Sequence, residues 1–230
     1  MMLQLKSKKK IYLYLIFLLI LSTVSNNNFS NFFKKTFKIK EIYVSGLSDK
    51  QNKKIQEKIK KLNYINIFSI EKDKIAKIIE NNNLVEKYKV KIKYPDQLLI
   101  NLYKTNIIGR VNSFDKDYFI GSNGKKISIS AIKLLENVPL VEGRFKTNDY
   151  VKFIRKINQS DLALNQIESL HFHKNRRWDI KTKNGFLIML PSKNIHKKLS
   201  IANELILNSG LKDFNKIDLR IKNKIITSYE

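Results

Sequence analysis

The 230-residue sequence contains no cysteine, only three prolines and seven glycines. Without cysteine the chain can form no disulfide, thiolate metal site or iron–sulfur cluster, and it has no cysteine nucleophile. The few glycines and prolines argue against glycine-rich nucleotide loops and long proline-rich linkers. A cysteine-free chain is tolerated in any compartment, so no redox environment follows.

Acidic residues are also scarce, with 20 Asp and Glu against 45 Lys and Arg, which gives a net charge of +25. Such a surplus raises the question of nucleic acid or an anionic membrane surface. The lysines are spread from end to end and form no basic stripe with interleaved aromatics, so we expect no nucleic-acid partner. Hydrophobic residues make up 43% of the chain, which is enough for packed cores.

The longest apolar run, IYLYLIFLLILSTV, is uncharged and lies at residues 11–24, directly after Lys8, Lys9 and Lys10. By the positive-inside rule these lysines orient the segment with its N-terminus in the cytoplasm. The run is shorter than the roughly 20 residues that span a bilayer, and its length also suits a signal peptide or, less well, a buried helix. Because Thr23-Val24-Ser25 matches a cleavage site only weakly, we favour a retained anchor. We therefore expect a cytoplasmic tail at 1–10, a transmembrane anchor at 11–28 and a juxtamembrane linker at 29–36.

Residues 37–105 have the pattern of a small β-α-α-β-β domain. A strand at 39–44 precedes a helix from Asp49 with Ile55, Ile59 and Leu62 on one face, and a second helix over 72–81. Strands at 85–94 and from 98 flank the Pro95-Asp96 turn, and both alternate apolar and polar residues.

Residues 106–230 are typical of a mainly antiparallel β domain. Asn123-Gly124 and Asn184-Gly185 each separate two short apolar runs and predict hairpins. Apolar spacing predicts two helices, near 149–158 and 195–208, and the alternation at Ile217, Leu219 and Ile221 predicts a strand before a last one at 224–229. The fold class is thus α+β, with one N-terminal transmembrane helix and two domains.

No pattern indicates an enzyme, a cofactor or a small-molecule substrate. The nucleophile motif G-x-S-x-G is absent, and Gly121-Ser122-Asn123-Gly124 lacks the spacing of a phosphate-binding loop. His171-Phe172-His173 could place two imidazoles on one side of a strand, but only His196 remains to complete a metal site, so we expect none. The segment Arg176-Arg177-Trp178 could stack or bind an anion, although such an arginine pair is more often a solvated rim.

Taken in order, several motifs resemble those of the FtsQ/DivIB family of bacterial cell-division proteins, over residues 37–229. The matching segments are Val44-Ser45-Gly46, Tyr94-Pro95-Asp96, Val138 to Gly143, Arg176 to Ile180 with Asn184-Gly185, and Ile217-Asp218-Leu219-Arg220. The chain departs from the family at Tyr103-Lys104-Thr105-Asn106, at Gly121 and at Ile221, where a Glu-Arg-x-Pro junction, an Asp and an aromatic residue are usual.

This resemblance implies a POTRA domain followed by a β domain, and a non-enzymatic scaffold of the divisome. It implies an inner-membrane protein of the division septum, with a cytoplasmic N-terminus and periplasmic domains. An upstream FtsK-like recruiter would contact the POTRA domain, and we expect this contact to involve Val85 to Lys93. The FtsB/FtsL-like subcomplex would bind the last strands, because a sheet edge can accept a partner strand.

The expected partner-binding residues are Arg220, Ile221, Asn223, Ile225, Ile226, Ser228 and Tyr229. Two alternatives remain open: another membrane-anchored POTRA-containing envelope assembly protein, and a tethered envelope enzyme.

Overall fold

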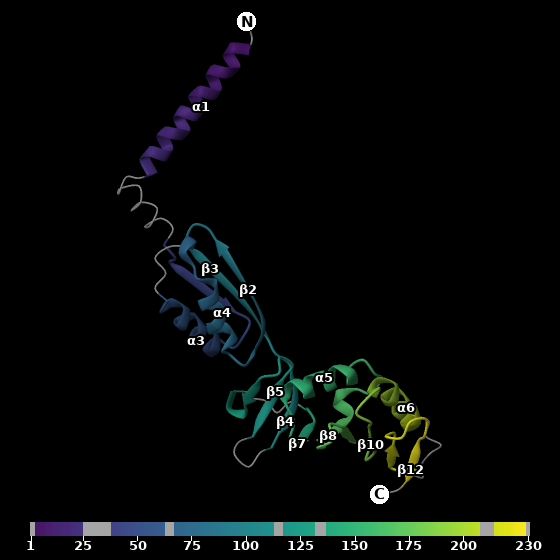
Figure 1. Ribbon diagram of the computed structural model, residues 1–230. Coiled ribbons are helices and arrows are strands. Elements are labelled where there is room, and N and C mark those ends of the chain that lie inside the picture. The colour runs from purple at the N-terminus through teal and green to yellow at the C-terminus, as the bar shows by residue number, and fades with distance from the viewer. Residues whose placement is uncertain are drawn as a thin grey trace. The chain divides into compact units, whose positions relative to one another are not determined.

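The computed structural model describes residues 3–24, 38–62, 67–112, 117–131, 137–207 and 214–228 (Figure 1). The chain divides into two compact units. Residues 1–81 and 88–103 form the first unit, and residues 82–87 and 104–230 form the second.

Helix α1 (Leu3–Val24) contains the N-terminal uncharged run. Its side chains from Ile11 to Leu21 are 52–66% exposed, so the helix presents apolar surface on all sides. Within the described ranges, no helix combines the length and the apolar character needed to cross a membrane. The transmembrane helix expected over 11–28 is therefore not found there: α1 is uncharged only from residue 11 to 24, and residues 25–28 lie outside the described ranges.

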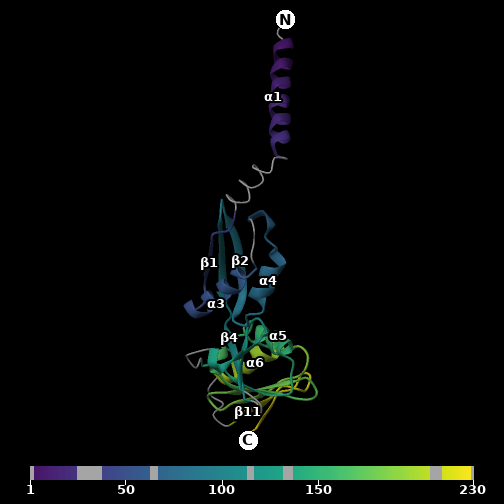
Figure 2. The same cartoon turned by 90° about the vertical axis from the view of Figure 1, so that its left-hand side faces the viewer.

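The first unit contains a three-stranded sheet with two helices (Figure 2). Its elements are β1 (Glu41–Ser45), α3 (Asp49–Lys60), a short 3-10 helix η1 (Ile67–Ser69), α4 (Lys72–Glu80), β2 (Val85–Lys93) and β3 (Gln97–Lys104). The sheet order is β1-β3-β2, with β1 parallel to β3. The predicted β-α-α-β-β order is confirmed.

Helix α3 forms where the sequence favours it. Asp49 in its first turn and Lys58 and Lys60 in its last turn complement the helix dipole. Ile55 and Ile59, one turn apart, are buried, as are Ile75 and Ile79 of α4. The alternating residues Leu98, Ile100 and Leu102 of β3 are also buried, so helices and sheet share one core.

The second unit is built on a sheet that has nine strands within the described ranges, in the order β12-β11-β10-β9-β8-β7-β4-β5-β6. The strands are β4 (Ile107–Val111), β5 (Tyr118–Gly121), β6 (Lys126–Ser128), β7 (Leu140–Gly143), β8 (Ile167–Phe172), β9 (Trp178–Thr182), β10 (Leu187–Met189), β11 (Lys216–Asp218) and β12 (Ile226–Ser228). The α-helices are α5 (Thr147–Ile157) and α6 (Ile195–Leu207), and η2 (Ile129–Ala131) and η3 (Leu164–Gln166) are 3-10 turns.

Most neighbouring strands in this sheet are antiparallel, but three pairs are parallel: β4 with β7, β7 with β8, and β10 with β11. Parallel neighbours need a long crossover connection, and α5 and α6 supply it for the last two pairs. In Figure 1 the two helices lie side by side along one face of the sheet, and they are in contact.

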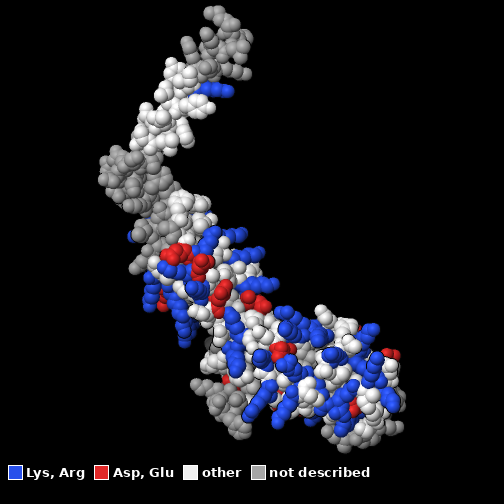
Figure 3. All heavy atoms as spheres, viewed as in Figure 1, with Lys and Arg blue, Asp and Glu red and all other residues white. Residues whose placement is uncertain are grey.

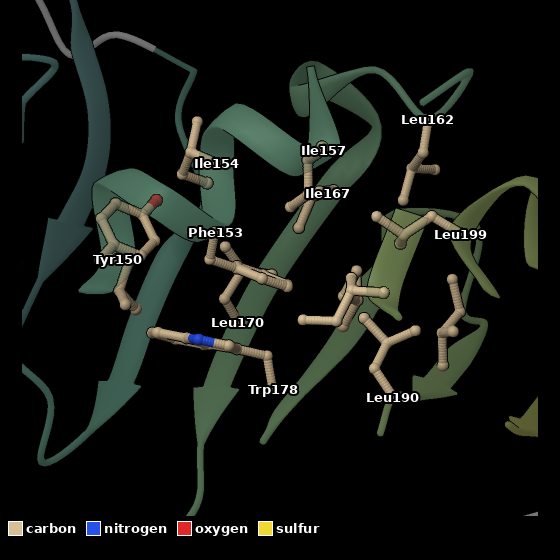
Figure 4. Packing of buried hydrophobic residues seen from close by; sticks show 14 of the residues in the cluster. Tyr150, Phe153, Ile154, Ile157, Leu162, Ile167, Leu170, Trp178, Leu190 and Leu199 are labelled. Carbon is tan, nitrogen blue, oxygen red and sulfur yellow. The ribbon is translucent and has the colours of Figure 1, made fainter. Parts of the chain in front are cut away.

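The core of the second unit lies between this helical layer and one face of the sheet (Figure 4). A row of side chains in register crosses five strands and is at most 1% exposed: Val141, Leu170, Ile180, Ile188 and Ile217. Trp178 stacks on Phe153 of α5, with ring centroids 4.9 Å apart and planes 11° apart. Aromatic and aliphatic packing thus fixes α5 and α6 to the sheet.

Candidate protein-interaction site

Strand β12 forms one edge of the nine-stranded sheet. It pairs antiparallel with β11, with Ile226 opposite Asp218 and Ser228 opposite Lys216, and no other described strand pairs with it. The Ser228 carbonyl accepts a hydrogen bond of 3.3 Å from the Asn215 N–H and therefore points toward β11. Because backbone groups alternate in direction along a strand, Thr227 directs its N–H and C=O toward the open edge.

Exposed isoleucines lie on both sides of the turn that leads into β12. Ile221 and Ile225 are each 47% exposed, and Ile226 is 46% exposed. Side chains of this size usually enter a core, so three of them together on one segment form an apolar surface beside an open strand edge.

The turn itself is fixed by Asn223, whose φ of 58° lies in the left-handed region. Asn adopts this conformation more readily than most residues with a side chain. The Lys224 N–H donates to the Ile221 carbonyl over 3.4 Å and closes the turn. The chain is thus reversed between β11 and β12.

Arg220 is held by Asp218, two residues before it. The guanidinium Nε donates to both carboxylate oxygens, at 2.8 and 2.9 Å, and a terminal nitrogen of Arg220 makes a further contact with Oδ2. The hydrogen bond from Arg220 is the main reason that the pKa of Asp218 lies below its ordinary value, although partial burial opposes it. Sequence reasoning missed Asp218 as a site residue, and the Asp-x-Arg spacing, which puts both side chains on one face of a strand, is the signal that could have revealed it.

Six of the seven expected partner-binding residues lie together on the exposed segment 220–228. The seventh, Tyr229, lies outside the described residues. The three expected topology residues, Lys8, Lys9 and Lys10, belong to α1, where Lys9 and Lys10 are exposed.

The sheet face opposite the helices has polar and charged residues. Glu142, His171, Asp179, Met189, Asp218 and Ile226 are in register across six strands. His173 is 2.7 Å from Asp179, and the Arg177 guanidinium is 3.8 Å from the same carboxylate. The row links β12 to Arg177, which reaches Asp179 on this face, whereas Trp178 packs against α5 on the other face.

The three histidines do not converge. His171 and His173 have ring centroids 4.6 Å apart, whereas His196 lies 2.9 Å from the carbonyl of Gln159. In the described ranges, no three histidine or acidic side chains are close enough to hold a metal ion.

Comparison with known proteins identifies both units. Residues 106–228 match the family model "FtsQ/DivIB, C-terminal related", and residues 37–103 match the model "POTRA domain, FtsQ-type". The chain is 25% identical over 192 residues to a cell division protein FtsQ of Rickettsia bellii, covering 82% of this chain and 71% of that protein. It is 26% identical over 220 residues to a cell division protein FtsQ of Bartonella bacilliformis, covering 92% of this chain and 71% of that protein.

A solved structure is also similar, that of the major extracytoplasmic domain of the trans isomer of the cell division protein DivIB from Geobacillus stearothermophilus. It has 14% sequence identity and a TM-score of 0.36, and the similarity covers 47% of this chain and 97% of that one.

The two family models define a POTRA-containing cell-division protein. The chain belongs to the FtsQ/DivIB family. The predicted resemblance is therefore confirmed, and the match of the second unit decides against a different type of POTRA-containing envelope protein.

Proposed function

We propose that this chain is a non-enzymatic scaffold of the divisome, which links early to late division proteins through its two units. The observation that carries the proposal is the open edge of β12 beside three exposed isoleucines. An edge strand offers unpaired N–H and C=O groups, and a partner strand can pair with them while its side chains contact neighbouring apolar residues. The partner is an FtsB/FtsL-like subcomplex.

The contact uses the backbone of β12 and the side chains around it. Thr227 supplies the N–H and C=O that face the open edge, and Ile221, Ile225 and Ile226 supply apolar contacts. Arg220 and Asn223 shape the segment through the pair with Asp218 and the turn. Ser228, the last residue of β12, and Tyr229, which lies outside the described residues, are the further contact residues of the proposal.

The test is a substitution that blocks only the open edge. Thr227→Pro removes one backbone N–H and keeps the hydrogen bonds from β12 to β11, because proline is tolerated where the N–H faces solvent. We expect Thr227→Pro to abolish co-purification of the FtsB-like subunit, with the melting temperature of the full chain unchanged.

Thr227→Val is the matched control, because it keeps the N–H and the β-branched shape, and it should bind like the wild type. If Thr227→Pro melted earlier, Ile225→Asp would test the same surface without changing the backbone. Co-purification that survives both Thr227→Pro and Ile225→Asp would contradict the proposal.

For the first unit we propose that an FtsK-like recruiter contacts β2. This strand and β1 form the two edges of the three-stranded sheet. Val90 is 37% exposed, and a groove of about 400 Å³ runs between α4 and β2, lined by Ile75, Tyr88, Val90 and Ile92. Val90→Asp should weaken recruitment, whereas Lys91→Gln, on the opposite face of the strand, should not. Equal recruitment by Val90→Asp and the wild type would refute this contact.

We also propose that α1 anchors the chain in the inner membrane, with Lys8, Lys9 and Lys10 in the cytoplasm and both units in the periplasm at the septum. The exposed apolar surface of α1 supports this arrangement. Its uncharged part is about 21 Å long at 1.5 Å per residue, so flanking lysines must reach to the interface or the bilayer must thin locally. The full chain should resist carbonate extraction, and its second unit should be protease-accessible in spheroplasts and protected in intact cells; release by carbonate would contradict the anchor.

A further inference from the structure

Two hollows flank Phe172 at the end of the second unit where β8 turns into β9. The larger, about 800 Å³, is lined by Arg144, His171, His173 and Lys174, and the smaller, about 200 Å³, lies between α5, Arg176 and the first residue of α6. Phe172 belongs to the wall of both, so the two hollows are neighbours and are considered together as one surface.

This surface carries cations that no carboxylate neutralises. Arg144 and Lys174 line the larger hollow, and Lys152, Lys156 and Arg176 line the smaller; all five are exposed. Within the described ranges none of them forms an ion pair, whereas Lys181 pairs with Glu168 and Arg177 with Asp179.

The nearby acidic residues do not compensate this charge. Asp149 is the one carboxylate that lines either hollow. Glu142 and Asp179 are engaged by His171 and His173, at 3.5 and 2.7 Å. On the face drawn in Figure 3, Lys and Arg are spread over both units, so a local site must be distinguished from the general surplus of positive charge by its geometry.

That geometry is found in the β8–β9 turn. Arg176 has a φ of 61°, in the left-handed region where glycine is the usual residue. The Arg176 N–H donates to the His173 carbonyl over 2.9 Å, and the His173 N–H donates to the Arg177 carbonyl over 3.0 Å, so the turn is closed. An arginine is thus kept at a backbone position that disfavours it, two residues after Lys174 in the same turn.

The floor under these cations is rigid. Phe172 lies against Trp178 with ring centroids 4.7 Å apart, and Trp178 stacks on Phe153 of α5. Because the aromatic cluster is buried, the turn and the exposed face of α5 are held in fixed positions. The backbone positions that carry the cations are therefore fixed before any ligand binds.

We propose that this surface binds a phosphate ligand with more than one negative charge, such as a pyrophosphate group. The arginine fork fits phosphate oxygens, and five unpaired cations around one aromatic residue exceed what a single carboxylate could neutralise. The ligand is either a phosphate compound in solution or the headgroup of a lipid. This site is independent of the partner contacts at β12 and β2.

The single tryptophan of the chain, Trp178, provides the measurement. Full-length protein in nonionic detergent is titrated with inorganic pyrophosphate while the tryptophan fluorescence is recorded. A second titration replaces phosphatidylcholine in mixed micelles by phosphatidic acid, whose headgroup is a phosphate monoester that can carry two negative charges. A saturable change in the first titration identifies a soluble ligand, and one in the second identifies a lipid headgroup.

Arg176→Gly separates binding from folding. Glycine favours the backbone conformation of this turn, so the variant should melt at the same temperature as the wild type or higher. The affinity should fall about tenfold, the effect expected from losing one charge-assisted phosphate contact. Lys174→Gln should weaken binding in the same direction.

Lys126 lies on β6, the edge strand at the end of the sheet opposite β12. Lys126→Gln is the control for the loss of one exposed positive charge. It should change the affinity by less than about twofold, because the remaining effect is long-range and screened by salt. No saturable change in either titration would overturn the proposal, as would a loss in Lys126→Gln equal to that in Arg176→Gly.

Discussion

The hydroxyl of Tyr150 in α5 donates a 2.6 Å hydrogen bond to the carbonyl of Ile108 in β4. Tyr150 is fully buried, and burial raises the pKa of its hydroxyl well above the ordinary value of 10.0. Gly109 makes room for this bond, because a Cβ at that position would lie 2.5 Å from the Tyr150 oxygen. One hydrogen bond thus joins the helical layer to a strand that precedes it by 42 residues.

Tyr150→Phe should destabilise the second unit by about 1–3 kcal/mol, because the buried Ile108 carbonyl loses its donor while packing is kept. The measurement is thermal unfolding followed by Trp178 fluorescence. An unchanged melting temperature would mean that the carbonyl finds another donor.

The same pair predicts a response to alkaline pH. The pKa of Tyr150 is raised in the folded state, so its contribution to stability is complete below about pH 10, the unfolded value, and falls as the pH rises above it. Above that pH the wild type should lose stability more steeply than Tyr150→Phe. Parallel pH profiles would contradict the assignment of the raised pKa to this residue.

The pair of Asp218 and Arg220 should make the difference in stability between the wild type and Arg220→Gln depend on pH in the acidic range. The pKa of Asp218 is lowered in the folded state, so the stabilisation is present above about pH 4, the unfolded value, and is lost as the pH falls toward the folded value. The wild type should be more stable than Arg220→Gln at neutral pH, and this advantage should disappear in strong acid. Asp218→Asn provides the control, because adding Arg220→Gln to this variant should have little further effect on its stability.

Two glycines with similar backbone angles should respond differently to substitution by alanine. Gly143 has a φ of 96° and Gly185 a φ of 85°, but a Cβ at Gly143 would overlap the Phe172 carbonyl oxygen, whereas a Cβ at Gly185 meets nothing within 4 Å. Gly185→Ala should cost about 1 kcal/mol from the left-handed conformation alone. Gly143→Ala should cost about 3 kcal/mol or more, since β7 and β8 must also separate. Equal losses in thermal melts would show that only the backbone angle matters.

Depletion of the protein should produce filamentous cells if the scaffold proposal is correct. Expression of wild type or Thr227→Val should restore septa, and Thr227→Pro should not. The measurement is the distribution of cell length by microscopy, with immunoblots to confirm equal amounts of each variant. Normal division during depletion would contradict the role in the divisome.

Local patterns in the sequence predicted most of the regular elements. Helical spacing at Ile55 and Ile59 indicated α3, and the turn at Asn184-Gly185 indicated the hairpin of β9 and β10. Strands β4 and β7 escaped prediction because they have five and four residues and show no clear alternation. The parallel pairing of β7 with β8 depends on contacts across α5, which no local pattern encodes.

The open sheet edge at β12 could be predicted only in part from the sequence. Alternation at Ile217, Leu219 and Ile221 predicted one strand, but β11 ends at Asp218, where the side chain turns back to hold Arg220. The exposed isoleucines were expected there because the family resemblance implied that the last strands bind a partner. Their position at an unpaired edge depends on the order of the whole sheet, which only the structure provides.

The crossover through α6 has a consequence for the order of folding. The β11–β12 hairpin is local in sequence, but it joins the sheet only when β11 pairs with β10 across the whole helix, so Thr227 comes to lie at the edge of the complete sheet only after this long-range pairing. During synthesis the residues of β12 also emerge after all the strands that support them. A partner that recognises this edge therefore selects chains whose second unit has finished folding, and incomplete chains offer it nothing to bind.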